Sequence, residues 1–319
     1  MALIINRLRA GIPGSRSARG WVALAIVYVV WGSTFTAIQV AERALPPLLM
    51  AGVRFLFAGA ILYALAWRGD GLRWRRPTWP QFYSAGLVGL FLLAAGNGLV
   101  CLAELRVPSG LAALMIATVP VWMALMGMAW GSGHSPGAVG WIGVLVGLLG
   151  VVVLASPTTS GHLALISVIG LLVAAACWAF GSLYSGRGPV PTNVFQASAI
   201  EMLVGGIALV VVALLTGEAH QVHWGHVWGV PLLAFGWLVL GGSFLAYTCY
   251  VYALKVLPTS TVATYAYINP LVALALGFVI LGQDLSPGSG LAAGLITLGV
   301  VLIVSGPHLR RRRPVGAVT

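Results

Sequence analysis

Long apolar runs separated by short polar breaks organise the whole chain. The runs are roughly 20 residues long, which is the length that an α-helix needs to cross the hydrocarbon core of a bilayer. They show no strict alternation of apolar and polar residues, so the pattern indicates helical spans and not the strands of a membrane barrel. We predict ten spans, at residues 21–40, 47–67, 81–102, 109–131, 138–156, 164–184, 193–215, 228–252, 260–281 and 289–306.

The composition strengthens this prediction. Of the 319 residues, 60% are hydrophobic and 7% are charged, and the mean hydropathy is +0.99. A soluble domain carries about 25% charged residues, so this chain cannot cover a water-facing surface of its size. We therefore expect an all-α integral membrane protein with no separate soluble domain.

The net charge of +11 has to be interpreted from the positions of the basic residues along the chain. In a soluble protein such a charge would suggest a nucleic-acid partner, which we do not expect here. If the N-terminus lies inside, most of the 17 basic residues fall in the inner loops and tails, the positive-inside pattern. Both termini are therefore predicted to be cytoplasmic, with anionic lipids at that face. The outer loops instead hold Glu42, Glu104, Glu218 and Asp284.

The second half of the chain repeats features of the first. Two nearly equal shifts, of 150 and 147 residues, relate prolines, glycines and deep tryptophans of the two halves. We predict two five-span units, 21–156 and 164–306, between basic tails at 1–20 and 307–319. Because five is odd, the second unit enters the membrane from the opposite side, as in many secondary transporters. The matched positions include Pro108 with Pro258, Pro120 with Pro270, Trp31 with Trp178 and Arg54 with Glu201.

Short motifs follow one another in the order of the spans. They are Val30-Trp31-Gly32-Ser33-Thr34-Phe35, Arg54-Phe55, Pro120, Trp178-Ala179-Phe180-Gly181 and Tyr267-Ile268-Asn269-Pro270. Together they resemble the EamA family of the drug/metabolite transporter superfamily, across all ten spans. The segments 46–55 and 199–202 are similar to its YedA branch, and the YddG amino-acid exporters are more distant relatives.

The resemblance implies ten spans around a central cavity and alternating access. It also implies export of amino acids, metabolites or toxic compounds across a bacterial inner membrane. Many relatives end the third span with an aromatic-rich stretch, whereas Asn97, Cys101 and Glu104 stand here, so the substrate stays open. A passive channel is the alternative, because a sequence can predict a cavity but not whether both ends open together.

Other chemistry finds little support in the sequence. The phosphate-binding motif Gly-x-x-x-x-Gly-Lys-Ser/Thr is absent, and the only lysine, Lys255, lies in an apolar run. Hydrolase motifs are absent too, so we do not expect the protein to be an enzyme. We further expect no cofactor, a small-molecule substrate and a monomeric protein. Neither the cysteines, Cys101, Cys177 and Cys249, nor the histidines, His220, His223 and His226, have the spacing of a metal site. The loop that holds the three histidines is expected to be hydrated.

Polar and aromatic side chains at helix breaks are the candidates for the cavity. Tyr265 and Asn269 share a helix face, and Pro270 removes a backbone hydrogen bond beside them. Pro120 makes the corresponding break in the fourth span. A packing kink, helix–helix contact or lipid-facing bulk is the alternative for each residue. The substrate-binding candidates are Trp31, Asn97, Trp122, Trp178, Ser243, Tyr247, Tyr265 and Asn269.

Arg54 and Glu201 are candidates for gating or coupling, together with Pro120 and Pro270. An ionisable side chain deep in a span costs ~2.5–3.5 kcal/mol on insertion scales and is a functional candidate by default. The inversion would place Arg54 toward the periplasm and Glu201 toward the cytoplasm, too far apart for an ion pair. Arg54 would hold backbone carbonyls or an anionic substrate group, and Glu201 a cationic group or a proton. The alternative is that both snorkel and neither matters to transport.

Overall fold

The computed structural model describes residues 13–68, 76–130, 137–155, 165–283 and 287–311, and in these ranges the chain forms helices and no strand. Parts of the predicted basic clusters lie outside the described residues, as does Asp284 of the outer loops. The basic residues concerned are Arg7, Arg9, Arg73, Arg75, Arg312 and Arg313.

The helices follow the predicted runs closely. The first, α2, begins at Pro13, inside the segment predicted as a tail, and the last, α16, extends to Arg311. In chain order they are α2 (Pro13–Ala41), α3 (Pro47–Arg68), α4 (Trp79–Gly89), η1 (Leu90–Asn97), α5 (Gly98–Glu104), α6 (Ser109–Ile116), α7 (Val119–Ala129), α8 (Gly137–Ala155), α10 (Leu165–Ser185), α11 (Val194–Leu215), η2 (Glu218–Gln221), η3 (Trp224–His226), α12 (Val230–Trp237), η4 (Leu238–Tyr247), α13 (Thr248–Val256), α14 (Thr259–Val262), α15 (Tyr265–Leu281) and α16 (Pro287–Arg311).

Seven helical segments of the described chain are long and apolar enough to cross a membrane. They are Ser17–Ala41, Pro47–Arg68, Trp79–Glu104, Ser109–Ala129, Leu165–Ser185, Val194–Leu215 and Val230–Val256. Shorter apolar stretches lie within three further predicted spans, at Ala138–Gly150, Ile268–Leu281 and Gly290–Gly299. Many large apolar side chains along these helices are exposed, as a lipid-facing surface requires.

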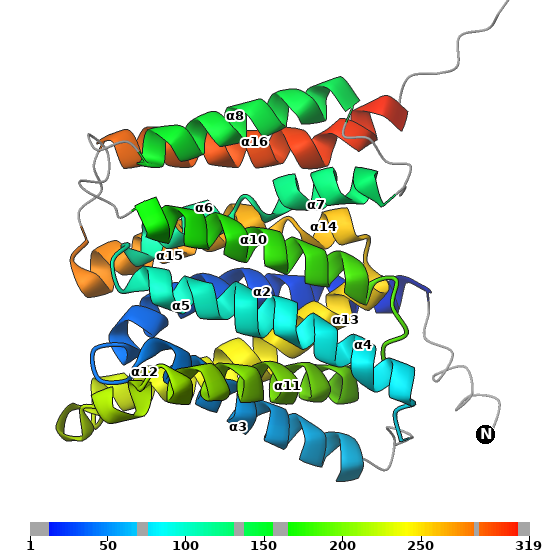
Figure 1. Ribbon diagram of the computed structural model, residues 1–319. Coiled ribbons are helices and arrows are strands. Elements are labelled where there is room, and N and C mark those ends of the chain that lie inside the picture. The colour runs from blue at the N-terminus through cyan, green and yellow to red at the C-terminus, as the bar shows by residue number, and fades with distance from the viewer. Residues whose placement is uncertain (1–12, 69–75, 131–136, 156–164, 284–286, 312–319) are drawn as a thin grey trace, which may run out of the picture.

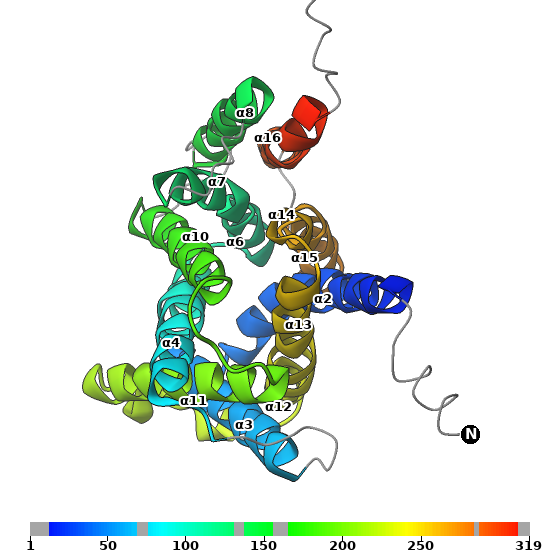
Figure 2. The ribbon, with the colours of Figure 1, turned by 90° about the vertical axis from the view of Figure 1, so that its right-hand side faces the viewer.

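The helices lie side by side along a shared direction (Figure 1). In the view at right angles, α8 and α16 pack against each other at one end of the bundle, and α3 and α11 lie at the other (Figure 2). Helix α2 contacts α15, α13, α12 and η4 of the second half. Helices of the two halves are therefore interleaved, and a site between them draws side chains from both.

Two spans contain a π-helix in their middle. The segment η1 continues α4 into α5, and η4 continues α12 into α13. A π-helix bonds residue i to i+5, is rare, and occurs frequently at functional sites. Hydropathy predicted the spans but neither π-helix.

The proline-associated breaks are offset from the prolines themselves. Helix α6 ends at Ile116, and Pro120 lies in the first turn of α7 after a turn at Thr118, whose hydroxyl donates to the Met115 carbonyl at 2.7 Å. In the ninth predicted span, α14 ends at Val262, whereas Pro270 lies inside α15. Pro270 still lacks an N–H to donate, so one carbonyl of the preceding turn loses its usual helical donor.

Helices α4 and α11 approach closely enough for their backbones to touch. A Cβ atom built on Gly89 would lie 2.1 Å from the main-chain oxygen of Glu201, and one on Gly205 would lie 2.7 Å from that of Gly89. Backbone atoms cannot yield as the end of a flexible side chain can. Glycine at these two positions therefore fixes the distance between α4 and α11.

We expect Gly89→Ala to lower the stability of the purified protein by about 1–3 kcal/mol, because the added methyl group overpacks this contact. Thermal unfolding in detergent measures the change. Gly236→Ala is the matched control, since a Cβ there meets nothing within 4 Å. Equal melting temperatures for the two variants would contradict the close approach of α4 and α11.

Candidate functional site

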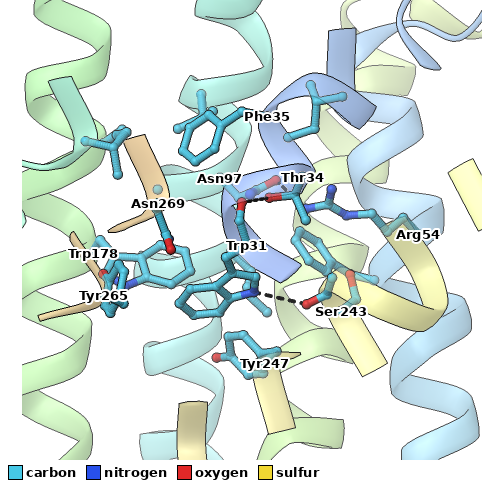
Figure 3. A pocket seen from close by; sticks show the side chains of 18 residues that line it. Trp31, Thr34, Phe35, Arg54, Asn97, Trp178, Ser243, Tyr247, Tyr265 and Asn269 are labelled. Atoms are coloured by element: carbon cyan, nitrogen blue, oxygen red, sulfur yellow. Dashed lines mark hydrogen bonds between the residues drawn. The ribbon is translucent and has the colours of Figure 1, made fainter. Parts of the chain in front are cut away.

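A cavity of about 70 Å³ lies between helices of both halves. Figure 3 shows Trp31 in its middle, with Arg54 on one side and Trp178 and Tyr265 on the other. The cavity is lined by Trp31, Thr34, Phe35, Ile38, Arg54, Phe55, Leu93, Gly96, Asn97, Val100, Ile116, Ala174, Trp178, Gly242, Ser243, Tyr247, Tyr265 and Asn269.

The structure brings most of the substrate-binding candidates together in this cavity. The exception is Trp122, which lines a separate, almost wholly apolar hollow of about 340 Å³ with Met126 and Phe180. Helix α7, which carries Trp122, begins after the turn at Thr118, and this turn changes the face that α7 presents. The candidates in the central cavity are Trp31, Asn97, Trp178, Ser243, Tyr247, Tyr265 and Asn269.

An aromatic cluster forms one side of the cavity. The Trp31 ring lies 4.8 Å from that of Tyr250, 5.3 Å from Trp178 and 5.4 Å from Tyr265, measured between centroids. Its indole Nε1 donates to the Gly242 carbonyl at 3.1 Å, within η4. A deep tryptophan needs such a partner, and the π-helix supplies it. The Nε1 atom of Trp178 is buried without a hydrogen-bond partner.

Arg54 forms the polar side. Its side chain is 4% exposed, and one terminal nitrogen donates to Oδ1 of Asn97 at 2.7 Å. The guanidinium carbon lies 4.4 Å from the centre of the Phe55 ring, a cation–π contact. Its Nε and its other terminal nitrogen have no hydrogen-bond partner. A buried guanidinium with free donors is suited to bind an anionic group that enters the cavity.

Glu201 is fully buried behind the cavity wall. One carboxylate oxygen accepts the Tyr247 hydroxyl at 2.8 Å, and the other has no partner, so Arg54 and Glu201 do not form an ion pair. Asn97 and Tyr247, the partners of the two charges, are the last residues of η1 and η4. Each deep charge therefore bonds the end of a π-helix, and both π-helix ends line the cavity.

Ser243, Tyr247 and Tyr250, three polar residues of the eighth predicted span, have two different roles. Ser243 and Tyr247 face the cavity, whereas the Tyr250 hydroxyl is 2.7 Å from that of Ser182 and bonds α10 to α13. Asn269 lines the cavity and also joins helices. In the amide orientation that satisfies its surroundings, its nitrogen donates to the main-chain oxygens of Tyr28 at 2.9 Å and Tyr265 at 3.3 Å.

Sequence reasoning missed several residues at the site. Thr34 and Phe35 line the cavity and belong to the first motif, which could have marked them. Glu104 was predicted in an outer loop, but it ends α5 and is 4% exposed. In the described chain no group of three His, Cys, Asp or Glu side chains could hold a metal ion.

Comparisons with known proteins agree with this architecture. The model of the EamA-like transporter family matches residues 18–156 and again 165–305. The "Uncharacterized inner membrane transporter YedA" of Escherichia coli (strain K12) is 38% identical over 302 residues, 92% of this chain and 94% of that protein. The "Probable amino-acid metabolite efflux pump" of the same strain is 26% identical over 94% of this chain and 100% of that one.

A solved crystal structure also has this fold. It superposes with a TM-score of 0.65 at 23% sequence identity and covers 95% of this chain and 100% of its own. At this identity the likeness concerns the arrangement of helices alone.

Proposed function

Because the chain belongs to the EamA-like transporter family, we propose that it is a secondary transporter that exports small metabolites by alternating access. Amino acids or amphipathic compounds are the proposed substrates, and the bacterial inner membrane is the proposed location. The observation that carries the proposal is the central cavity, with a buried cation on one side and aromatic rings on the other.

The chemistry of the two sides of the cavity matches that of the two ends of an apolar amino acid. The free donors of Arg54 can bind a carboxylate. The aromatic cluster of Trp31, Trp178 and Tyr265 offers an apolar wall to a side chain. The printed name of the amino-acid metabolite efflux pump points to the same class of substrate.

Alternating access requires two opposed halves. We propose ten spans in two inverted five-span units, 21–156 and 164–306, because the family model matches the chain twice. A five-span unit reverses direction when it is repeated, which places a shared site between the halves. Arg54 and Glu201, each bonded to the end of a π-helix, are the proposed gating or coupling groups of the two halves.

The proposed topology places both termini in the cytoplasm, because basic residues concentrate in the tails and in the inner loops. A reporter enzyme that is active only in the periplasm, fused after Pro307, is expected to give no activity. The same reporter fused after Gly217, in an outer loop of this topology, is expected to be active and serves as the control. Strong activity of the Pro307 fusion would overturn the orientation.

Uptake by purified protein in lipid vesicles tests the transport function. The screen covers amino acids and cationic drugs, with and without a pH gradient, in vesicles that contain anionic lipid. Saturable uptake that unlabelled substrate on the opposite side accelerates is expected for a carrier. Unitary currents across a planar bilayer would instead establish a channel, in which both ends of the cavity open together.

A further inference from the structure

A second polar pocket lies at one end of the cavity and has no part in the function proposed so far. We call it the acidic vestibule and define it by Gln39, Glu42, Glu104 and Gln283. Its volume is about 300 Å³. The Gln39 amide nitrogen donates to the Glu104 and Val107 carbonyls, at 3.1 and 2.8 Å, and its oxygen accepts from Gln283. This amide network links α2 to the end of α5 and to the residues after α15.

The acidic vestibule continues the central cavity by one helical turn. Ile38 and Val100 line the cavity, and Glu42 and Glu104 follow each of them four residues later. The N–H of Glu42 donates to the Ile38 carbonyl at 2.9 Å, so the helical turn persists past the end of α2. Four residues advance an α-helix by about 6 Å. Two helices thus carry one carboxylate each just beyond the cavity.

These carboxylates are poorly satisfied by the protein. Glu104 is 4% exposed, and neither of its oxygens has a hydrogen-bond partner. One oxygen of Glu42 is also buried without a partner. An ionised carboxylate in such a setting is costly unless a cation neutralises it. The vestibule therefore favours a bound positive charge.

In the described part of the chain, four charged or titratable groups surround Glu42 and Glu104. Arg54, on α3, interacts electrostatically with both carboxylates but bonds Asn97, and Arg43 lines the vestibule at an exposed position. The Glu218 carboxylate accepts the Leu49 N–H at 2.8 Å. The Cys101 thiol, on α5, is 3.6 Å from Asn97 Oδ1.

These neighbours act on the Glu42 carboxyl in opposite directions. Burial raises its pKa well above the ordinary value, the Arg54 guanidinium opposes this shift, and the Glu218 carboxylate adds to it. Two carboxylates that share a site also disfavour each other's ionised form. The proton is therefore the cation that this environment accommodates most readily.

We propose that Glu42 and Glu104 together bind one exchangeable proton, and that this proton frees Arg54 for an anionic group of the substrate. The proton comes from the water of the acidic vestibule and converts one carboxylate to a neutral carboxyl group. One negative charge then no longer attracts the guanidinium, whose free donors face the cavity. The proposal rests on the proposed transport function and adds a second coupling site, at the end of the cavity opposite Glu201. Proton binding and substrate binding thereby favour each other, a thermodynamic coupling between two sites. Proton and substrate then cross in the same direction, so export is driven by the outward substrate gradient.

Proton binding is testable without any substrate. Infrared difference spectra between acidic and alkaline pH report the carbonyl band of protonated carboxyl groups in the vesicle-bound protein. The double variant Glu42→Gln/Glu104→Gln is expected to lose a component of this band, whereas Glu218→Gln, a carboxyl at the same end but outside the vestibule, is expected to keep it. An unchanged band in the double variant would overturn the proton site.

Transport of labelled L-leucine tests the coupling. In the double variant we expect accumulation driven by a pH gradient to fall about tenfold. Exchange without a gradient should persist, because the neutral glutamines mimic the protonated state in which Arg54 is free. Equal losses in both assays would show a general defect and overturn the coupling. If the unaltered protein does not carry L-leucine, the proposed substrate fails, while the infrared measurement still decides the proton site.

Discussion

Arg54→Gln is expected to weaken binding of L-leucine in exchange experiments by roughly 10- to 100-fold. The substitution removes the buried cation of the cavity and its free donors, and a hydrogen bond to a charged group contributes ~1.5–3 kcal/mol. Glutamine keeps a polar side chain but has neither the charge nor the full length of arginine. The concentration dependence of exchange in proteoliposomes measures the effect.

Arg54→Lys separates charge from geometry. Lysine restores the positive charge but not the planar fork, so an intermediate affinity is expected. Leucinol lacks the carboxylate, so its binding affinity should change little when Arg54 is replaced. If both replacements bind L-leucine as the unaltered protein does, Arg54 has a structural role only.

Glu201→Gln is expected to abolish the response of transport to pH on the cytoplasmic side. Glutamine has the same shape and still accepts the Tyr247 hydroxyl bond, but it cannot release a proton. The measurement uses vesicles with one protein orientation, in which the pH of each side is varied in turn. Because the acidic vestibule lies beyond the opposite end of the cavity in the proposed topology, the response to outer pH should persist.

Arg54→Gln and Tyr247→Phe are the controls for this measurement. Both keep the Glu201 carboxyl, so both should retain a response to cytoplasmic pH even if their rates fall. Unchanged rates and pH profiles in Glu201→Gln and Arg54→Gln together would show that neither side chain matters to transport.

The helical architecture and the family could be predicted because they depend on features that are local in the sequence. A run of apolar residues must bury its backbone as a helix in lipid, wherever its neighbours lie. Trp31 and Trp178 were predicted at depth by their matched positions, and both line the cavity. The family assignment, which rested on the order of short motifs, is confirmed.

The remaining features depend on how each helix is rotated about its axis. Trp122 was predicted to face the cavity because it follows Pro120, but α7 points it into another hollow. Glu104 looked like a loop residue because a charge after an apolar run usually marks the membrane surface. Its main-chain oxygen accepts a hydrogen bond from Gln39, which in turn accepts one from Gln283. Both glutamines are distant in the sequence and could not be placed beside Glu104 by periodicity.

The two π-helices change which residues share a face of the span before and after them. An α-helix turns by about 100° per residue, and each π-helix inserts one residue into this progression. Positions before Leu90 and after Asn97 therefore differ in angle from an uninterrupted count, and the same holds across Leu238–Tyr247. A single-residue deletion within either segment would restore the ordinary phase and rotate half of that span, carrying Asn97 or Tyr247 away from its charged partner.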